Sequence, residues 1–274
     1  MPVISTNSAA NSAVMYLNIN SAQEGSALSK LSSGSRITSA SDDAAGLAIS
    51  TRISSDITTL QQAATNASQA TSILQTADGG ASNISDILAR MKSLSSESAS
   101  GTVTDSSRAY INSEFSQLTS EVDSIASGTR YSSQSLLDGT SAFSSGVAVL
   151  VGSTASDTIT ITLTSLTASS LGLTSLDVST LSGATSALSA LDTAINSVSA
   201  ARATIGAQES RFNFSASSIS TQTQNLQSAN SVIKDVDIAS EQAMLSSAEV
   251  KTQAAVSAET AANQMPQYLL KLLG

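Results

Sequence analysis

The residues best suited to chemistry in this sequence are two adjacent carboxylates, Asp42 and Asp43. Paired carboxylates can bind a metal ion or serve as an acid and a base. Adjacent side chains point apart, however, and no third ligand lies nearby in the sequence. The chain also contains no His and no Cys, so the usual zinc ligands and most activated nucleophiles are absent. We therefore predict no catalytic residue, no metal site and no cofactor, in a protein that is not an enzyme.

Asp42 and Asp43 are better suited to starting a helix. Their oxygens can accept hydrogen bonds from the free N–H groups of a first turn, where negative charge is also favourable. Upstream, Gly34 interrupts the helical pattern, and Arg36 offers a polar contact beside that turn. Residues 28–50 therefore predict the end of one helix, an irregular connector and the capped start of a long helix.

The composition favours thin seams between long helices over a thick globular core. Aromatic residues make up 3% and charged residues 12% of the chain, and much of the 41% hydrophobic fraction is Ala. The net charge of −9 argues against nucleic-acid binding, which needs clustered basic residues. No apolar run approaches the roughly 20 residues that span a membrane. We predict neither nucleic-acid nor membrane binding.

A seven-residue repeat predicts a long helix from about residue 43 to residue 98. Its main row is Ile53, Leu60, Ala67, Leu74, Ala81 and Leu88. A companion row, Ile57, Ala64 and Thr71, restarts as Ala77, Ile84 and Met91. These spacings are typical of a coiled-coil seam. The restart lies beside Asp78-Gly79-Gly80, and each glycine costs a helix about 1 kcal/mol relative to Ala. We predict one helix whose seam slips in phase at this point.

A second long repeat predicts another helix from residue 182. Its main row is Ala184, Leu191, Val198, Ile205, Phe212, Ile219, Leu226 and Ile233. Leu188, Ile195 and Ala216 partly fill the second row, and Arg202, Glu209, Thr223 and Asn230 make the rest polar. A shorter helix is predicted over 105–128, with Asp105 as N-cap and Gly128 as the residue that follows its end.

The segment between these helices has the period of a β-hairpin. Val147, Val149 and Val151 alternate with small residues, and Ile159, Ile161 and Leu163 alternate with Thr after a polar turn. Alternating β-branched residues on both sides of a turn predict two antiparallel strands. This is the only segment of the sequence with such a pattern.

The two ends of the chain are rich in Ala and Ser. Residues 1–41 have a weak helical pattern, and residues 237–274 carry a narrow stripe of small residues. Such segments bury too little alone to offset an ordering entropy of about 1–2 kcal/mol per residue. We expect the first segment to be disordered in a free chain and helical when packed. The repeats alone favour an intramolecular bundle, whereas the Ala-rich ends favour assembly between subunits.

Two longer motifs, one near each end of the chain, are specific enough to compare with known families. The first motif is Leu28-Ser29-Lys30-Leu31-Ser32-Ser33-Gly34, then Arg36-Ile37, Ala40 and Asp42-Asp43-Ala44-Ala45-Gly46-Leu47-Ala48-Ile49. The second is Ile205-Gly206-Ala207-Gln208 with Arg211-Phe212, then Ala262-Asn263-Gln264-Met265-Pro266-Gln267 with Leu269 and Leu272-Leu273. Both motifs resemble bacterial flagellin. The resemblance covers about 1–140 and 185–274, in the family's order and spacing.

The resemblance implies a mainly α fold, with long antiparallel coiled-coil helices from both chain ends and a small β-hairpin region in the middle. Residues 1–42 would form the N-terminal part of an inner core, and residues 236–274 its C-terminal helix. Residues 43–140 and 182–235 would form a helical shell domain, and residues 141–181 a short surface region. The short middle predicts that large outer domains are missing.

The function that the resemblance implies is a secreted structural subunit that polymerises into the flagellar filament, outside the cell, after export through the flagellar type III channel. Other partners implied are the filament cap, the hook-junction proteins and an export chaperone. Two alternatives stay open: a hook–filament junction protein, and a secreted adhesin or ligand that acts as a monomer.

Within this frame we expect particular residues to serve assembly. Those for packing in the core are Leu17, Leu28, Leu31, Leu245, Leu269 and Leu273, and those for the shell seam are Leu60, Leu88, Ile205 and Phe212. The family's contact with a Toll-like receptor maps to Arg90, Leu94 and Glu114, but Ala89 and Ser93 replace its usual Gln and Glu. We therefore expect weak or absent receptor activation.

Overall fold

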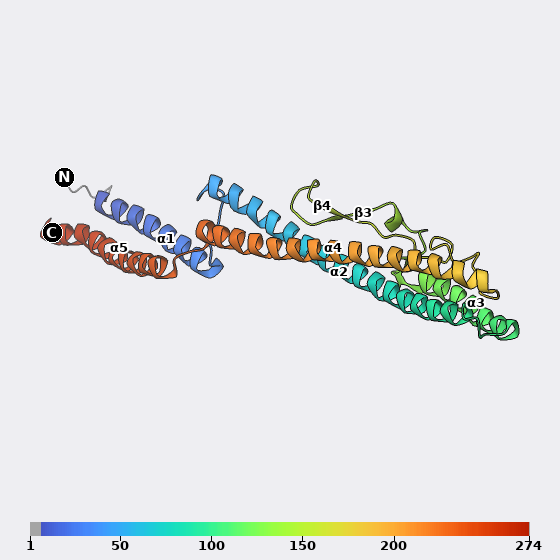
Figure 1. Cartoon of the computed structure of the whole chain (residues 1–274). Helices are drawn as coiled ribbons and strands as arrows, with labels where there is room; N and C mark the ends of the chain where they lie inside the picture. Colours follow the sequence, from blue (N-terminus) through green and yellow to red (C-terminus); the bar gives the residue numbers. More distant parts are fainter. Residues whose placement is uncertain (1–6, 274) are drawn as a thin grey trace. The chain divides into compact units, whose positions relative to one another are not determined.

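The computed structural model describes residues 7–273, without the side chains of Pro266 and residues 269–273. Its architecture is mainly helical, with small antiparallel strand pairs in the middle of the chain (Figure 1), as predicted. The helices are α1 (Ser8–Ser33), α2 (Ala44–Ser98), α3 (Asp105–Gly128), η1 (Ala142–Ser144), α4 (Leu181–Lys234) and α5 (Ile238–Leu273). The strands are β1 (Arg130–Tyr131), β2 (Gln134–Ser135), β3 (Val147–Leu150) and β4 (Thr158–Ile161).

The chain divides into two compact units. The terminal unit comprises residues 1–55 and 225–274, and the central unit comprises residues 56–224. Helices α2 and α4 contribute to both units, because the division falls inside each of them.

The core of the central unit lies along one face of α2. The buried apolar residues of this face from Leu60 to Met91 are Leu60, Ala63, Ala67, Ala70, Leu74, Ala77, Ala81, Ile84, Leu88 and Met91. They alternate three and four apart without a break, so the predicted slip in phase is wrong. The second row begins at Ala63 and Ala70, while Ile57, Ala64 and Thr71 are only half-buried. Small side chains occupy this row because they let neighbouring helices approach closely.

The facing helix α4 follows the same rule. Its second row consists of Ala187, Ala194, Ala201 and Gln208, and not of Leu188 and Ile195. Polar pairs join the two helices in antiparallel order (Figure 1): Arg202 Nε lies 2.8 Å from Asp78 Oδ1, Gln75 donates to Glu209 at 2.9 Å, and Lys92 pairs with Asp192. Hydrogen bonding to Asp78 raises the pKa of Arg202.

Glycines 79 and 80 do not interrupt α2. Nothing lies within 4 Å of the position that a Cβ would occupy at Gly79. At Gly80, a Cβ would lie 2.8 Å from Cγ2 of Thr129 and 2.9 Å from Cδ1 of Leu137. Gly80 therefore marks a close approach of the segment after α3 to the backbone of α2.

Helix α3 begins and ends differently from the prediction. Thr104, not Asp105, is its N-cap and accepts a hydrogen bond from Ser107 N at 3.3 Å. Asp105 lies in the first turn and pairs with Arg108 at 2.9 Å. Gly128 is the last helical residue, and Thr129 is the C-cap. Thr104 can serve as the cap because its hydroxyl accepts the same kind of bond as an Asp carboxylate. Asp105 then lies in the first turn, where its negative charge is favourable.

The predicted hairpin is present as β3 and β4, with Val147 opposite Ile161 and Leu150 opposite Thr158. Gln208 of α4 holds the end of β4, because its side chain accepts from Thr162 N at 3.2 Å and donates to Thr162 O at 3.0 Å. A second, two-residue hairpin joins β1 to β2. Its turn residues Ser132 and Ser133 both have positive φ, as in a type I′ turn. Strands this short have no detectable period in the sequence.

Candidate functional site

The terminal unit is built around an antiparallel pair, α1 and α5, which lie side by side (Figure 1). Residues that are buried or half-buried alternate three and four apart on both helices. On α1 they are Ala10, Ala13, Leu17, Asn20, Glu24, Ala27 and Leu31, with Lys30 half-buried beside Leu31, and on α5 they are Glu241, Leu245, Ala248, Thr252, Ala255, Glu259 and Ala262. The pair is thus a coiled coil whose seam is small and partly polar. The repeat on α1 looked weak in the sequence because Ala, Asn and Glu occupy most of it.

Polar contacts run along the whole length of this seam. Asn7 caps α1 by accepting from Ala10 N at 3.1 Å, and it donates to Ala262 O at 2.8 Å. Thr252 donates to Glu24 at 3.4 Å. Lys30 lies 3.9 Å from Glu241, whose side chain is buried. Such contacts favour one register of the two helices over a shifted one.

The connector after α1 is bound to the segment between α4 and α5. Gly34, with a φ of 68°, ends α1, and its carbonyl accepts from Val236 N at 3.1 Å. Ser35 forms an antiparallel bridge with Asp235. The guanidinium of Arg36 donates to Ile233 O at 2.9 Å and 3.3 Å. Arg36 therefore caps the C-terminal turn of α4, where free carbonyls and negative dipole charge favour a cation.

The two adjacent carboxylates act on different backbone groups. Asp43 accepts from Gly46 N at 2.8 Å and caps α2. Asp42 accepts from Thr38 N and Ser39 N, each at 2.9 Å, and closes the turn before the helix. These bonds, that from Ser39 first, lower the pKa of Asp42 to about 2. Among the described residues, no cluster of three or more His, Cys, Asp or Glu side chains could hold a metal ion.

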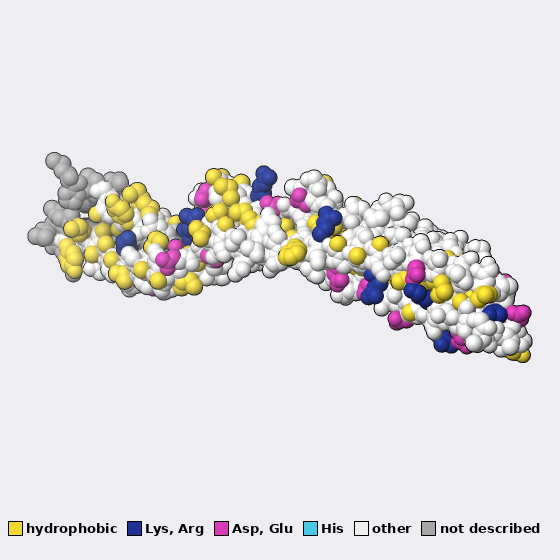
Figure 2. All heavy atoms as spheres, viewed as in Figure 1, with side chains coloured by type: hydrophobic (Ala, Val, Ile, Leu, Met, Phe, Trp, Pro, Cys, Tyr) yellow, Lys and Arg dark blue, Asp and Glu magenta, His cyan; other side chains and the backbone are white. Residues whose placement is uncertain are grey.

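Large apolar side chains of α1 and α5 also point away from the seam. The exposed ones are Val14, Met15, Tyr16, Ile19 and Leu28 on α1, and Ile238, Met244, Val250, Val256, Met265 and Tyr268 on α5. Figure 2 shows apolar side chains gathered over this part of the chain. We refer to these eleven residues as the outer apolar surface. Patches of this kind on a protein surface mark interaction sites.

The predicted core residues divide between the seam and this surface. Leu17, Leu31 and Leu245 lie on the seam, whereas Leu28 is 59% exposed and belongs to the outer apolar surface. The side chains of Leu269 and Leu273 lie outside the described residues.

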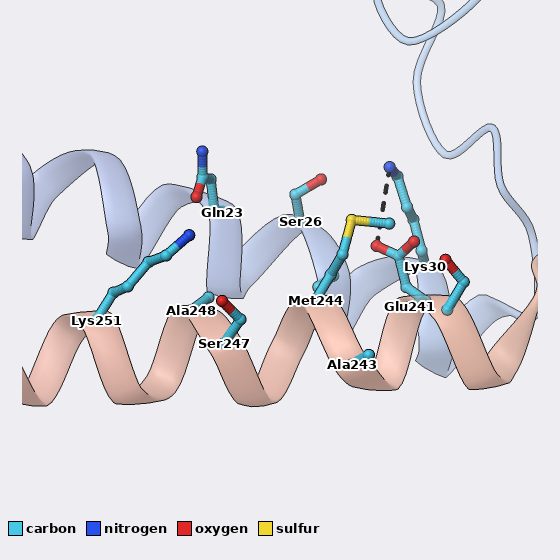
Figure 3. Close-up of a pocket in the computed structure, with 11 residues that line it drawn as sticks. Gln23, Ser26, Lys30, Glu241, Ala243, Met244, Ser247, Ala248 and Lys251 are labelled. Carbon is cyan, nitrogen blue, oxygen red and sulfur yellow. Dashed lines mark ion pairs between the residues drawn. The ribbon is translucent and has the colours of Figure 1, made fainter.

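A groove of about 520 Å³ runs between α1 and α5 (Figure 3). Gln23, Ser26, Met244 and Lys251 line it, together with the Lys30–Glu241 ion pair. Small, polar and charged side chains of both helices thus line the groove.

The four residues predicted for the shell seam are buried in the structure. None is more than 3% exposed: Leu60, Leu88, Ile205 and Phe212. Arg90 and Glu114, expected to contact an immune receptor, form an exposed ion pair with a shortest distance of 2.7 Å. Leu94 from the same expected contact is only 2% exposed. Of the three residues expected to contact the receptor, Arg90 and Glu114 are therefore exposed and Leu94 is not.

Other residues that position these elements were missed in the sequence. The guanidinium of Arg108 is buried and donates to Ser98 O at 2.8 Å and Ser100 O at 2.9 Å, which joins α3 to the end of α2. Ser35 and Gln208 likewise bind backbone groups distant in sequence. An isolated polar residue in a helical pattern gives no signal of such a partner.

Helices in the described part of the chain are not long and apolar enough to cross a membrane.

Two family models match this sequence. The family model of the bacterial flagellin N-terminal helical region matches residues 4–142, and that of the bacterial flagellin C-terminal helical region matches residues 188–273. The chain belongs to the bacterial flagellins. It is a structural subunit of the flagellar filament, as predicted, in a family of structural proteins and not of enzymes. The matched ranges leave only a short middle segment, as expected of a flagellin without large outer domains.

Individual flagellins agree with this assignment. The chain is 36% identical over 261 residues to a flagellin of Halalkalibacterium halodurans, with 94% of each chain covered. It is 35% identical over 283 residues to a flagellar filament 30.7 kDa core protein of Treponema maltophilum, with 99% of each covered. The crystal structure of Bacillus cereus flagellin superposes with a TM-score of 0.52 at 29% identity, over 61% of this chain and 94% of that one. Neither alternative, the junction protein or the monomeric ligand, gains support from these relatives.

Proposed function

We propose that the paired helices α1 and α5 form the contact between flagellin subunits in the filament, through the outer apolar surface. The observation that carries this proposal is the exposure of large apolar side chains on both helices, including Leu28 at 59%, Val250 at 69% and Tyr268 at 62%. Burying one such side chain contributes about 1.5–3 kcal/mol. We expect further copies of this chain to cover the outer apolar surface, because flagellins assemble into a homopolymer.

Folding of this pair is coupled to assembly. The seam within one chain consists largely of Ala and polar residues, so it offsets little of the entropy that ordering two long helices costs. In a free subunit we expect α1 and the end of α5 to unfold readily. At the growing end of a filament, neighbouring subunits would cover the outer apolar surface and stabilise both helices. Leu269 and Leu273 are included in the proposed contact by their place in the sequence.

The same proposal extends to location and partners. A chain whose ends order only on assembly is suited to export in an unfolded state, with the filament outside the cell as its destination. The filament cap, the hook-junction proteins and an export chaperone are the partners that such a route requires. We assign the chain no catalytic role, no cofactor, and no nucleic-acid or membrane partner.

Truncation tests the role of α5. Deleting residues 265–274 should leave a soluble helical monomer that does not polymerise, measured by circular dichroism and by sedimentation after seeding. A finer test replaces Val250 with Ser, which should raise the critical concentration for assembly. Gln253→Ser, an exposed polar position on the same helix, is the matched control. Normal filaments from the truncated chain would refute the proposal.

A receptor assay tests the remaining expectation. The Arg90–Glu114 ion pair is available on the surface, but Leu94 is buried and the neighbouring positions are Ala89 and Ser93. We expect purified monomer to activate a Toll-like receptor reporter weakly or not at all. A full-strength response would contradict this expectation.

A further inference from the structure

The methionines of this chain are distributed unevenly. The structure describes the side chains of Met15, Met91, Met244 and Met265. Met91 is fully buried in the α2 seam, whereas Met15, Met244 and Met265 are 53%, 53% and 64% exposed. All three exposed methionines lie on α1 or α5, within the outer apolar surface. Exposed thioethers are therefore concentrated on the surface proposed to bind the next subunit.

The sequence leaves few other targets for an oxidant. It contains no Cys, no Trp and no His, and only four Tyr. Thiols, which otherwise react first with peroxides, are absent. The thioethers of methionine are then the side chains that a two-electron oxidant attacks, and accessibility decides which ones react.

Met244 shows what such a reaction would change. It stands on α5 at the wall of the groove, beside the Lys30–Glu241 ion pair (Figure 3). Its unbranched side chain can fill an irregular contact. Oxidation would place a polar oxygen on this apolar position, and a neighbouring subunit would then have to bury that oxygen without a prepared partner.

We propose that Met15, Met244 and Met265 are oxidation sites through which a peroxide controls assembly of the subunit. The sulfur lone pair attacks one oxygen of hydrogen peroxide, the O–O bond breaks, and an S–O bond forms. The other oxygen leaves as hydroxide and, with the released proton, becomes water. Each sulfur loses two electrons, and the peroxide is reduced by the same two. The inference rests on the proposed role of the outer apolar surface.

Peroxide footprinting of the free subunit and of the seeded polymer tests the inference. In the free subunit, peptide mass spectrometry should find sulfoxide at residues 15, 244 and 265 and little at Met91. The oxidised subunit should show a critical concentration raised about tenfold, which corresponds to about 1.4 kcal/mol per subunit. Treatment with methionine sulfoxide reductases should restore assembly, because sulfoxide formation is reversible by these enzymes.

Substitution supplies the control. The triple variant Met15→Leu, Met244→Leu and Met265→Leu keeps the side-chain volumes but has no thioether at these positions. Whatever its critical concentration before treatment, peroxide should not raise it. Met91→Leu should remain as sensitive as the parent chain. The inference is overturned if the parent chain, oxidised at all three sites, assembles at the untreated critical concentration. Equal oxidation of these sites in polymer and free subunit would instead refute the proposed contact surface itself.

Discussion

Two neighbouring glycines of α2 should respond differently to the same substitution. Gly79→Ala adds a methyl group in open space, and Gly80→Ala adds one where Thr129 and Leu137 already lie within 3 Å. Both variants gain the helix propensity of Ala, about 1 kcal/mol over Gly. Only the second forces a methyl group into an occupied site.

The neighbours of Gly80 have little freedom to move away. The Thr129 hydroxyl donates to Ile125 O at 2.8 Å, and Thr129 O accepts from Leu136 N at 2.9 Å. Leu137 is 1% exposed. Overpacking of this kind costs about 1–3 kcal/mol. Because the propensity gain is common to both variants, their free energies of unfolding should differ by this amount, with Gly79→Ala the more stable.

Thermal unfolding of the monomer, followed by circular dichroism at 222 nm, measures the difference. For a unit of this size, 1 kcal/mol corresponds to about 2–4 °C in Tm. We expect Gly79→Ala at or above the Tm of the parent chain and Gly80→Ala below that of Gly79→Ala by several degrees. Equal Tm values for the two variants would refute the close approach at Gly80.

Three further substitutions probe other contacts. Arg108→Ala removes the buried donor to two carbonyls of the α2–α3 turn and should lower the free energy of unfolding in urea by about 2–4 kcal/mol. Asp105→Ala removes only the largely exposed partner of Arg108 and should lower it far less. Similar losses in the two variants would show that the carbonyl bonds matter little. Gln208→Leu removes both bonds to Thr162 and should cost about 1–2 kcal/mol and speed proteolysis within the β3–β4 hairpin; unchanged cleavage would mean that Gln208 does not hold it. Asp42 has a pKa lowered to about 2, so its stabilising contribution is present above its ordinary pKa near 4 and is lost as the pH falls toward 2. Asp42→Asn should therefore lose less stability than the parent chain between pH 4 and pH 2, and identical pH profiles would contradict this.

The sequence predicted the long helices because apolar residues, many of them large, recur at seven-residue intervals in one row of each seam. The second row was predicted correctly at Ala77, Ile84 and Met91 of α2. Its other members Ala63, Ala70, Ala187 and Ala194 were missed, because they resemble the many exposed alanines of the same helices. The slip in phase that we predicted on α2 came from starting the companion row at the large Ile57, which placed that row one residue away from the buried Ala63 and Ala70. Close helix packing prefers small residues, so size misled the assignment.

The candidate site could be predicted only in part for a similar reason. Gly34, Arg36 and Asp43 suggested a connector and a cap through their local chemistry. The partner of Arg36, the carbonyl of Ile233, lies 197 residues away in sequence, and no local pattern indicates it. Leu28 shows the opposite limit: an apolar residue at helical spacing suggests burial in the chain, yet its side chain is exposed. Only a structure separates a seam from a surface that another molecule could cover.

The most direct test of the proposed subunit contact is a helical reconstruction of filaments grown from this chain by electron cryomicroscopy. We predict that α1 and α5 are helical in the polymer. We also predict that neighbouring subunits cover Tyr16, Ile19, Leu28, Met244 and Val250, which are exposed in the single chain. A filament in which these side chains face solvent, while other parts of the chain make the contacts, would contradict the proposal.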